Sequence, residues 1–401
     1  MKNEIKYPIA VTLCLTAILS QAQQPLEANV PALSQTNKKG SSYKFTEEKM
    51  IPAFPVQSQG RTGTCWSFST VSYFESEILK AGKMKGVKLS EMYVVREIYA
   101  LKAENFIRMH GKANFGEGGE PTDILECWKK FGLVPLEAYN GKLDPSVGYN
   151  HKLLDSTLQS EVVKMADPKN QKIDLTECMK RINTLLDQFL GAPPDTFAFQ
   201  GKKYSPKSFA AALGIMPQQY ELFTSFSHHP YYQKFILEVP DNWAWKQYMN
   251  LPLNEMVEII DNAILNGYGV AWASDVSEQD FRFRDGLALV PKGWETMTES
   301  EKNACYMKPC LQEAITPEMR QMGYDNYETQ DDHGMHIIGM AKDQDGNKYF
   351  VVKNSWGKDR NECGGYFYVS EAYLKLKTIS ITVNRKAVPA TIQKKITTFK
   401  G

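Results

Sequence analysis

The stretch QGRTGTCWSF, residues 59–68, is the part of this chain that most strongly indicates a fold and a chemistry. Apolar residues recur at Phe68, Val71 and Phe74, which is the spacing of a buried helix face. Cys65 therefore stands at the first turn of a predicted helix, where the partial positive charge of the helix N-terminus favours a thiolate. The thiol is a candidate nucleophile, although a free cysteine is most often a small buried core residue.

Gln59, at the start of the same stretch, is the candidate partner of this thiol. Its side-chain amide and the backbone N–H of Cys65 could converge on one point. Two such donors would stabilise the oxyanion that forms when a thiolate attacks a carbonyl group. The stretch therefore predicts covalent catalysis by a thiol.

A second informative stretch, DDHGMHIIGMAKDQDGNKYFVVKNSWG, covers residues 331–357. Its Asp-Gly pair at 345–346 lies between two apolar runs, a strong signal for a hairpin with a two-residue turn. In that register Gln344 pairs with Asn347. The sequence therefore predicts two neighbouring antiparallel strands, with a histidine at the start of the first and an asparagine at the end of the second.

The same register decides which histidine can meet the asparagine. Asn354 should lie opposite Ile337, and His333 shares the face of Ile337 because strand side chains alternate. His336 points to the other face, so His333 is the predicted partner, although a register slip of one residue would reverse the choice. Such an imidazole would take the thiol proton, and Asn354 would accept the other ring N–H.

A double glycine at Gly118 and Gly119 opens the segment EGGEPTDILECWKKFGLVP, residues 117–135. Two adjacent glycines permit a tight turn and also allow a ligand backbone to approach closely. Pro121 and the residues after it then start a predicted helix that ends near Gly132. From the residues alone, a plain turn and a ligand contact are equally good interpretations.

These motifs together resemble those of the papain-like cysteine peptidases. QGRTGTCWSF resembles the active-site stretch of that family, while DHGM and NSWG resemble its histidine and asparagine segments in matching order. The resemblance implies a catalytic set of Cys65, His333, Asn354 and Gln59. It also implies substrate contacts at Gly118, Gly119 and Trp356, with Gly119 pairing with the substrate backbone.

Two departures point to the branch of bleomycin hydrolase and aminopeptidase C. Thr62 occupies the position of the family's second cysteine, and the separation of Cys65 from His333 far exceeds the ~130–150 residues of ordinary members. The resemblance implies an aminopeptidase that acts on peptides, in a mostly cytosolic branch that often forms homo-oligomeric rings. The C-terminal tail, residues 388–401, does not resemble the terminal arm of that branch, so an endopeptidase and a catalytically silent binding protein remain alternatives.

The expected fold is α+β: a papain-like fold of two lobes with a long, mainly helical insertion. The expected segments are a signal peptide at 1–22, a flexible lead-in at 23–42, a helical lobe at 56–139, an insertion at 140–250 and a β-rich lobe at 251–390. The peptidase domain as a whole is placed at 43–401. The catalytic cleft should lie between the lobes, with the insertion capping or flanking it.

The N-terminus and the composition set the remaining expectations. Lys2 and Lys6 precede a short apolar run and small residues, a pattern typical of a cleaved export signal, so we expect a periplasmic or extracellular protein without membrane insertion after cleavage. The 47 Lys and Arg balance 46 Asp and Glu, which gives no basic footprint for nucleic acid.

No cofactor and no metal site are expected. His228 and His229 are adjacent and should project differently, and no carboxylate or cysteine at a suitable spacing completes a ligand set. Cys305 and Cys310 are interpreted as a disulfide of an exported protein or as two free thiols rather than as zinc ligands.

Overall fold

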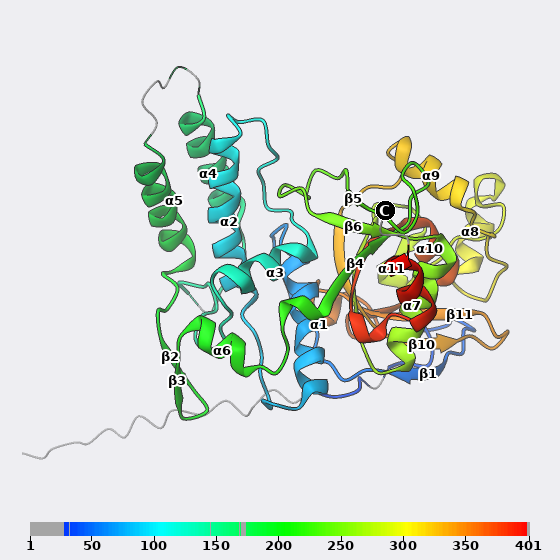
Figure 1. Cartoon of the computed structure of the whole chain (residues 1–401). Helices are drawn as coiled ribbons and strands as arrows, with labels where there is room; N and C mark the ends of the chain where they lie inside the picture. The colour runs from blue at the N-terminus through cyan, green and yellow to red at the C-terminus, as the bar shows by residue number, and fades with distance from the viewer. Residues whose placement is uncertain (1–27, 32, 145, 168, 170–173, 399–401) are drawn as a thin grey trace, which may run out of the picture.

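The computed structural model describes residues 28–31, 33–144, 146–167, 169 and 174–398. A helical half and a half built on a large sheet lie side by side, with helix α1 between them (Figure 1). The expected signal peptide at 1–22 and the first part of the lead-in lie outside the described residues. The two halves agree with the expected α+β architecture of two lobes.

The helical half is built around α2, which contacts α1, α3, α4 and α5. Asp174 caps α5 by accepting hydrogen bonds from the backbone N–H groups of the first turn, and Ile182, Leu186 and Leu190 form its buried face. Helices α4 and α5 both lie in the segment 140–250 that was expected to be mainly helical. The elements of this half are α1 (Cys65–Ala81), α2 (Glu91–Arg108), α3 (Pro121–Lys130), α4 (Lys152–Met165), α5 (Leu175–Leu190), α6 (Pro206–Ala212) and a hairpin of β2 (Phe197–Phe199) and β3 (Lys202–Tyr204).

The other half holds an 11-stranded sheet in the order β5-β6-β4-β13-β7-β10-β11-β12-β9-β8, with β1 paired to β10. Most neighbours are antiparallel, while β4 with β6 and β12 with β9 are parallel. The strands are β1 (Thr46–Met50), β4 (Tyr220–Thr224), β5 (Lys234–Ile236), β6 (Gln247–Asn250), β7 (Val270–Ser274), β8 (Phe281–Arg282), β9 (Leu287–Ala288), β10 (His333–Lys342), β11 (Lys348–Lys353), β12 (Tyr366–Ser370) and β13 (Thr378–Asn384).

The sheet takes in more of the chain than the sequence indicated. Residues 220–250, expected in a mainly helical insertion, supply β4, β5 and β6, because β4 pairs with β13 from near the C-terminus. The further helices are α7 (Leu253–Leu265), α8 (Glu299–Cys305), α9 (Pro317–Asp325), α10 (Glu371–Lys377) and α11 (Ala390–Thr398). Short 3-10 helices are η1 (Pro217–Gln219), η2 (Phe283–Asp285), η3 (Trp294–Thr296), η4 (Lys358–Arg360) and η5 (Arg385–Ala387).

Strand β10 links the two halves because helices pack on both of its faces. Met335 and Ile337 belong to the same buried cluster as the apolar face of α7. On the other face, Gly334 lies against Trp66 and His336 hydrogen-bonds to Ser72, both on α1. Nine of the ten residues of this strand are buried, which explains its near-continuous apolar character.

The expected register of the β10–β11 hairpin is wrong in two places. Asp343 N–H donates to Asn347 O at 3.1 Å, so the loop has three residues rather than two, with Gly346 at φ 84°. A second shift occurs between Ile337 and Gly339. The two one-residue shifts add up to two, which restores the original face, so Asn354 still lies on the side of His333.

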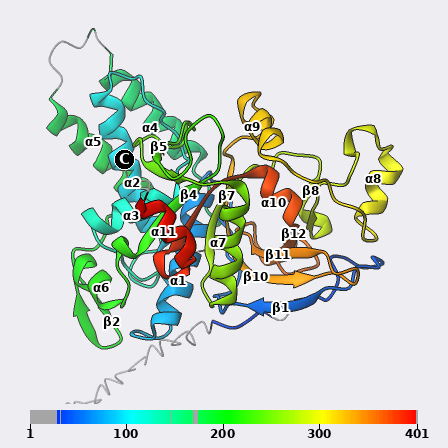
Figure 2. The ribbon, with the colours of Figure 1, turned by 45° about the vertical axis from the view of Figure 1, so that its right-hand side comes forward.

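The described part of the tail packs against α7. Ile392 of α11 is buried in the α7 cluster, and Lys395 pairs with Glu255 of α7 at 2.6 Å. Figure 2 shows α11 lying beside α7. Among the described residues, no helix is both long enough and apolar enough to cross a membrane.

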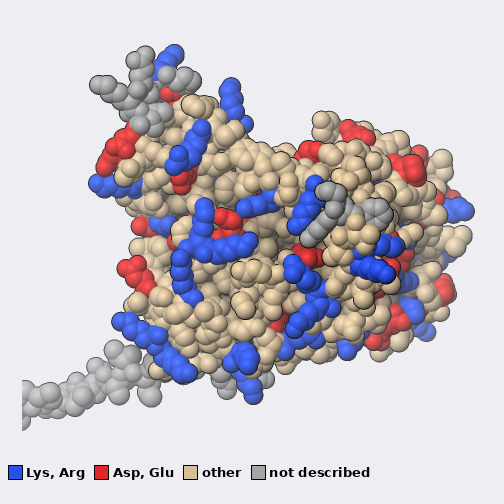
Figure 3. Space-filling model, viewed as in Figure 1, with Lys and Arg blue, Asp and Glu red and all other residues tan. Residues whose placement is uncertain are grey.

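The outline of the molecule is notched between the half that carries α4 and α5 and the half that carries the sheet (Figure 3). Lys and Arg lie in separate groups across the middle of this face, with acidic side chains among them and towards the right-hand edge.

Candidate active site

Cys65 is the first residue of α1, as the sequence predicted. The backbone N–H groups of Ser67 and Phe68 both donate to Thr64 O, at 3.0 and 3.2 Å, which closes the first turn behind the thiol. Trp66 is buried, and its ring Nε1 donates to Glu117 O at 3.0 Å. The helix N-terminus and its partial positive charge are therefore fixed beneath the sulfur.

His333 and Asn354 are in direct contact, with His333 Nε2 and Asn354 Oδ1 2.7 Å apart. The backbone N–H of Ser355 also donates to Asn354 Oδ1, at 2.7 Å. A backbone N–H can only donate, so this atom is the amide oxygen and His333 Nε2 must carry the proton that it accepts. The imidazole is held in the tautomer that leaves Nδ1 with a lone pair, ready to accept a thiol proton.

Gly334 lets β10 approach the first turn of α1. A Cβ on Gly334 would lie 2.7 Å from Ser69 Oγ and 3.1 Å from Trp66 Cα, so only glycine permits β10 to approach the first turn of α1 this closely. The backbone N–H of Gly334 hydrogen-bonds to the Cys65 sulfur. The peptide that joins His333 to Gly334 therefore lies directly against the candidate nucleophile.

Gln59 is held beside the same turn by its neighbours. Its Nε2 donates to Thr62 O at 2.7 Å, and its Oε1 accepts from Ser355 Oγ at 2.6 Å. A glutamine amide has two N–H groups, and among the described residues the second one has no hydrogen-bond acceptor. The side chain is thus oriented by two bonds while one donor stays available for an oxyanion.

Trp356 packs on the imidazole ring of His333. Its ring centroid lies 4.7 Å from that of His333 at an interplanar angle of 31°, and Phe283 supports its other side. The indole shields the contact between His333 and Asn354 from water. Since Trp356 is itself partly exposed, a contact with substrate remains a prediction.

The double glycine lies close to α1 and is fixed by a buried lysine. Lys102, on α2, donates to Gly118 O at 2.5 Å and to Gly116 O at 2.6 Å. A Cβ on Gly119 would lie 2.9 Å from the Trp66 ring, so this segment packs against the residue that follows Cys65. The double glycine therefore packs beside the first turn of α1, and its contact with substrate stays a prediction.

Three carboxyl groups that the sequence analysis did not single out surround this edge. Asp241 packs on Gly118: a Cβ there would lie 1.9 Å from Asp241 Oδ2. Glu120 follows the double glycine and accepts from Tyr248 OH at 2.9 Å, but its Oε1 is buried with no partner among the described residues. The carboxyl group of Asp331 lies within hydrogen-bond reach of Glu120.

Burial governs the ionisation of these groups. It raises the pKa of Asp331 to about 6, and it raises the pKa of Glu120 well above its usual range, with Asp331 adding to the rise. Two carboxylates in contact repel unless a proton or a cation lies between them. The pKa of Asp241 is also raised by burial, against the attraction of Lys102.

Burial also disfavours the charged forms of Cys65 and His333, the thiolate and the imidazolium. It raises the pKa of Cys65 to about 12, opposed by the backbone N–H groups of Gly334 and Trp66, with Asp331 and Asp241 contributing to the rise. It lowers the pKa of His333 to about 4, opposed by the hydrogen bond to Asn354. Burial therefore disfavours an isolated charge on either group.

The structure thus brings together Cys65, His333, Asn354 and Gln59 with the double glycine. Sequence reasoning missed Lys102 and the three carboxyl groups. Glu120 and Asp331 adjoin recognised motifs and could have been noticed. Asp241 gave no local signal, because only the fold places it on Gly118.

Comparison with known proteins agrees with this geometry. The model of the Peptidase C1-like family matches residues 108–399. The chain belongs to that family. It is therefore a cysteine-type peptidase, and the expected papain-like branch of bleomycin hydrolase and aminopeptidase C is confirmed.

Curated relatives cover most of the chain. An aminopeptidase C of Lactobacillus delbrueckii subsp. lactis is 22% identical over 90% of this chain and 88% of its own length. A mitochondrial cysteine proteinase 1 of Saccharomyces cerevisiae is 22% identical over 86% of this chain and 78% of its own. Among solved structures, PepW from Lactobacillus rhamnosis aligns with a TM-score of 0.68 and 19% identity over 88% of this chain and 85% of that one, which supports the fold.

These relatives correct the expected location. The exported location is wrong, because the aminopeptidase C branch to which they belong is intracellular and the yeast relative is named mitochondrial. The signal-like pattern at 1–22 misled because a short apolar run after lysines is not specific to export.

All six cysteines in the described part of the chain are free, so Cys305 and Cys310 are two thiols rather than a disulfide.

Proposed function

We propose that the protein is a cysteine aminopeptidase that removes residues from the free N-termini of peptides, with Cys65 as nucleophile and His333 as general base and acid. The single observation that carries the proposal is the group of carboxyl side chains beside the double glycine. An endopeptidase cleft must accept uncharged chain on both sides of the scissile bond, whereas this cleft offers a site for a cation close to the thiol.

The proposed chemistry uses the contacts described above. His333 Nδ1 takes the Cys65 proton as the sulfur attacks the carbonyl carbon, and Asn354 holds the ring through Nε2–H. The oxyanion is stabilised by the free N–H of Gln59 and the backbone N–H of Cys65. His333 then protonates the departing amine, and water hydrolyses the thioester to release the N-terminal residue.

Asp241 is the proposed anchor for the substrate ammonium group. It accepts from Asn114 Nδ2 at 3.0 Å through Oδ1, while its Oδ2 lies over Gly118, where the backbone of a bound substrate would pass. An ammonium placed there would also lie near the carboxyl groups of Glu120 and Asp331, which are in contact with each other. A positive charge at this position would favour the ionised forms of these carboxyl groups, which burial otherwise disfavours.

The position of the C-terminal tail favours Asp241, rather than a group of the tail itself, as the anchor for the substrate ammonium group. Up to Thr398 the tail packs on α7 through Ile392 and Lys395. Residues of the cleft are therefore the better candidates for recognising the N-terminus. Assembly into a homo-oligomeric ring, implied by the resemblance, remains a prediction.

The test compares hydrolysis of one peptide series with free N-termini and the same series acetylated, with cleavage positions determined by mass spectrometry. Stepwise release from free peptides only, abolished in Cys65→Ala, would support the proposal. Internal cuts in both series would make the enzyme an endopeptidase, and no cleavage by the unaltered protein would favour the silent binding protein.

The variant Asp241→Asn tests the anchor separately. A charge-assisted hydrogen bond contributes roughly 1.5–3 kcal/mol, so the KM for free peptides should rise about 10- to 100-fold while the variant stays folded. Asp195→Asn, an exposed aspartate of the helical half, is the matched control and should leave the KM unchanged. An unchanged KM in Asp241→Asn with intact aminopeptidase activity would exclude Asp241 as the anchor without affecting the proposed nucleophile.

A further inference from the structure

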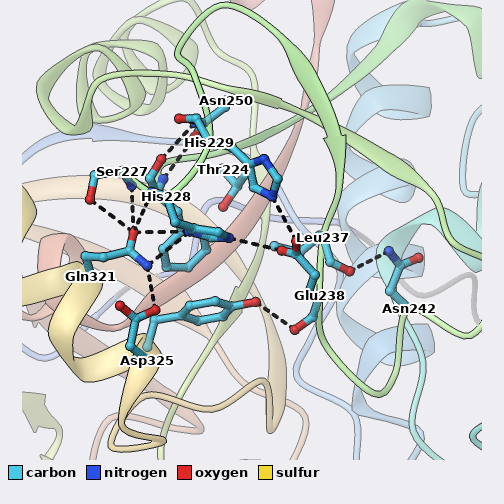
Figure 4. Close-up of polar contacts among 12 residues, drawn as sticks. Thr224, Ser227, His228, His229, Leu237, Glu238, Asn242, Asn250, Gln321 and Asp325 are labelled. Atoms are coloured by element: carbon cyan, nitrogen blue, oxygen red, sulfur yellow. Dashed lines mark hydrogen bonds and ion pairs between the residues drawn. The ribbon is translucent and has the colours of Figure 1, made fainter.

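Two adjacent histidines outside the cleft converge on one carboxylate (Figure 4). His228 Nε2 lies 3.1 Å from Glu238 Oε2, and His229 Nε2 lies 2.8 Å from Glu238 Oε1. One atom of each side chain lies within 4.8 Å of the others. The histidines follow β4 and the glutamate follows β5, so the sequence did not show that Glu238 completes the set.

A buried asparagine holds the backbone that carries His228 and His229. Asn250, at the end of β6, is fully buried and donates through Nδ2 to Phe226 O at 2.8 Å and to His229 O at 2.9 Å. Phe226 N–H donates back to Asn250 Oδ1 at 2.9 Å. These bonds hold the turn between β4 and β5 in one conformation, which explains how neighbouring side chains can point at one spot.

The imidazole rings are also held from the side. The His229 ring stacks on Phe235 with centroids 4.2 Å apart, and the His228 ring stacks on Tyr324 at 5.6 Å. His228 Nδ1 lies 3.0 Å from Gln321 Nε2 and 3.3 Å from Gln321 Oε1, on α9. These contacts hold both rings with Nε2 directed at Glu238.

We infer that His228, His229 and Glu238 form a binding site for a divalent transition metal ion of the zinc class. Two imidazole nitrogens and a carboxylate are ligands that Zn²⁺ prefers, with water in the fourth position. In a tetrahedral zinc site, neighbouring ligand atoms lie about 3.4 Å apart. The distances of 2.8 and 3.1 Å, each to a different oxygen of Glu238, lie within a few tenths of an ångström of that value. The ligand atoms, with one from each side chain, lie within 4.8 Å of one another, so the two imidazoles need only a small rotation to reach one ion.

Metal binding at this site moves protons without needing a further reactant. In the ligand-free arrangement each Nε2–H donates to Glu238. When the metal binds Nε2, that proton is released to solvent and Nδ1 takes up a proton from water in its place. The side chains of His228, His229 and Glu238 are 30%, 34% and 53% exposed, which leaves a path for the ion and a position for its water.

The test uses the full chain carrying Cys65→Ala, because a thiol beside His333 can itself bind Zn²⁺. Zn²⁺ is titrated against a chromophoric chelator, and melting curves are recorded with and without Zn²⁺. We expect one Zn²⁺ per chain at micromolar concentration and a higher melting temperature. His229→Ala in the same background should weaken this binding at least tenfold and abolish the shift.

Control variants separate a metal site from a structural contact. His110→Ala removes another exposed histidine and should change neither affinity nor melting shift. Glu238→Gln keeps the shape of the carboxylate and should weaken Zn²⁺ binding if the charge coordinates the ion. The proposal is overturned if the Cys65→Ala protein binds no Zn²⁺ at micromolar concentration, or if its affinity is the same in His229→Ala.

Discussion

The cleft and the His228–His229–Glu238 cluster use the same groups in opposite ways. In the cleft, one buried imidazole has one acceptor, Asn354, which fixes its tautomer and leaves Nδ1 free for a proton. In the cluster, two partly exposed imidazoles each contact the carboxylate of Glu238 through Nε2. The difference teaches that a single oriented acceptor prepares a histidine for proton transfer, whereas two histidines on one carboxylate prepare a place for a cation.

The largest effect should come from removing the nucleophile. Cys65→Ala should lower kcat/KM by about 10⁴-fold or more, because loss of a nucleophile removes the covalent route altogether. His229→Ala, in the other region, should keep activity within about twofold. Activity is measured with a free tripeptide under reducing conditions. Comparable losses in the two variants would break the distinction between the regions.

The next effect is on stability against acid. His333 has a pKa of about 4 in the folded protein, below the ordinary value of 6.5, so the unfolded chain binds more protons between these values. The stability it contributes is present above pH 6.5 and is lost as the pH falls towards 4, by about 3 kcal/mol. Denaturant unfolding of His333→Gln should show a smaller loss across that window. An identical pH dependence would mean that this imidazole is not buried as described.

A smaller effect is expected for the orienting side chain. Asn354→Ala should lower kcat by about 10²-fold with little change in KM, because the ring loses the acceptor that fixes its tautomer and orientation. Asn326→Ala, an exposed asparagine after α9, is the matched control. Steady-state kinetics with a free peptide measures both parameters. A rise in KM alone would instead assign Asn354 to substrate binding.

The smallest effect should come from a chelator. Dipicolinate should change kcat/KM by less than about twofold, since the proposed chemistry uses only side chains of the cleft. In protein loaded with Zn²⁺, the same treatment should lower the melting temperature. A large loss of activity on chelation, restored by Zn²⁺, would contradict the separation of the two regions.

The sequence revealed the cleft because its chemistry lies in short motifs with local consequences. Cys65 follows from helix periodicity, and His333 from strand alternation, which survived because two register shifts compensated for each other. The carboxylate of Asp241 and the ligand set at Glu238 could not be predicted. Both depend on strands β4 to β6 joining the large sheet through β13, a long-range pairing that periodicity does not show.

The most direct test of the central claim is to trap the acyl-enzyme. The protein is mixed with an ester substrate that has a free amino group, quenched in acid and analysed by intact and peptide mass spectrometry. We predict an acyl group on the peptide that contains Cys65, with much less from the acetylated ester and none in Cys65→Ala. An acyl group on another residue, or turnover without any thioester at Cys65, would contradict the account.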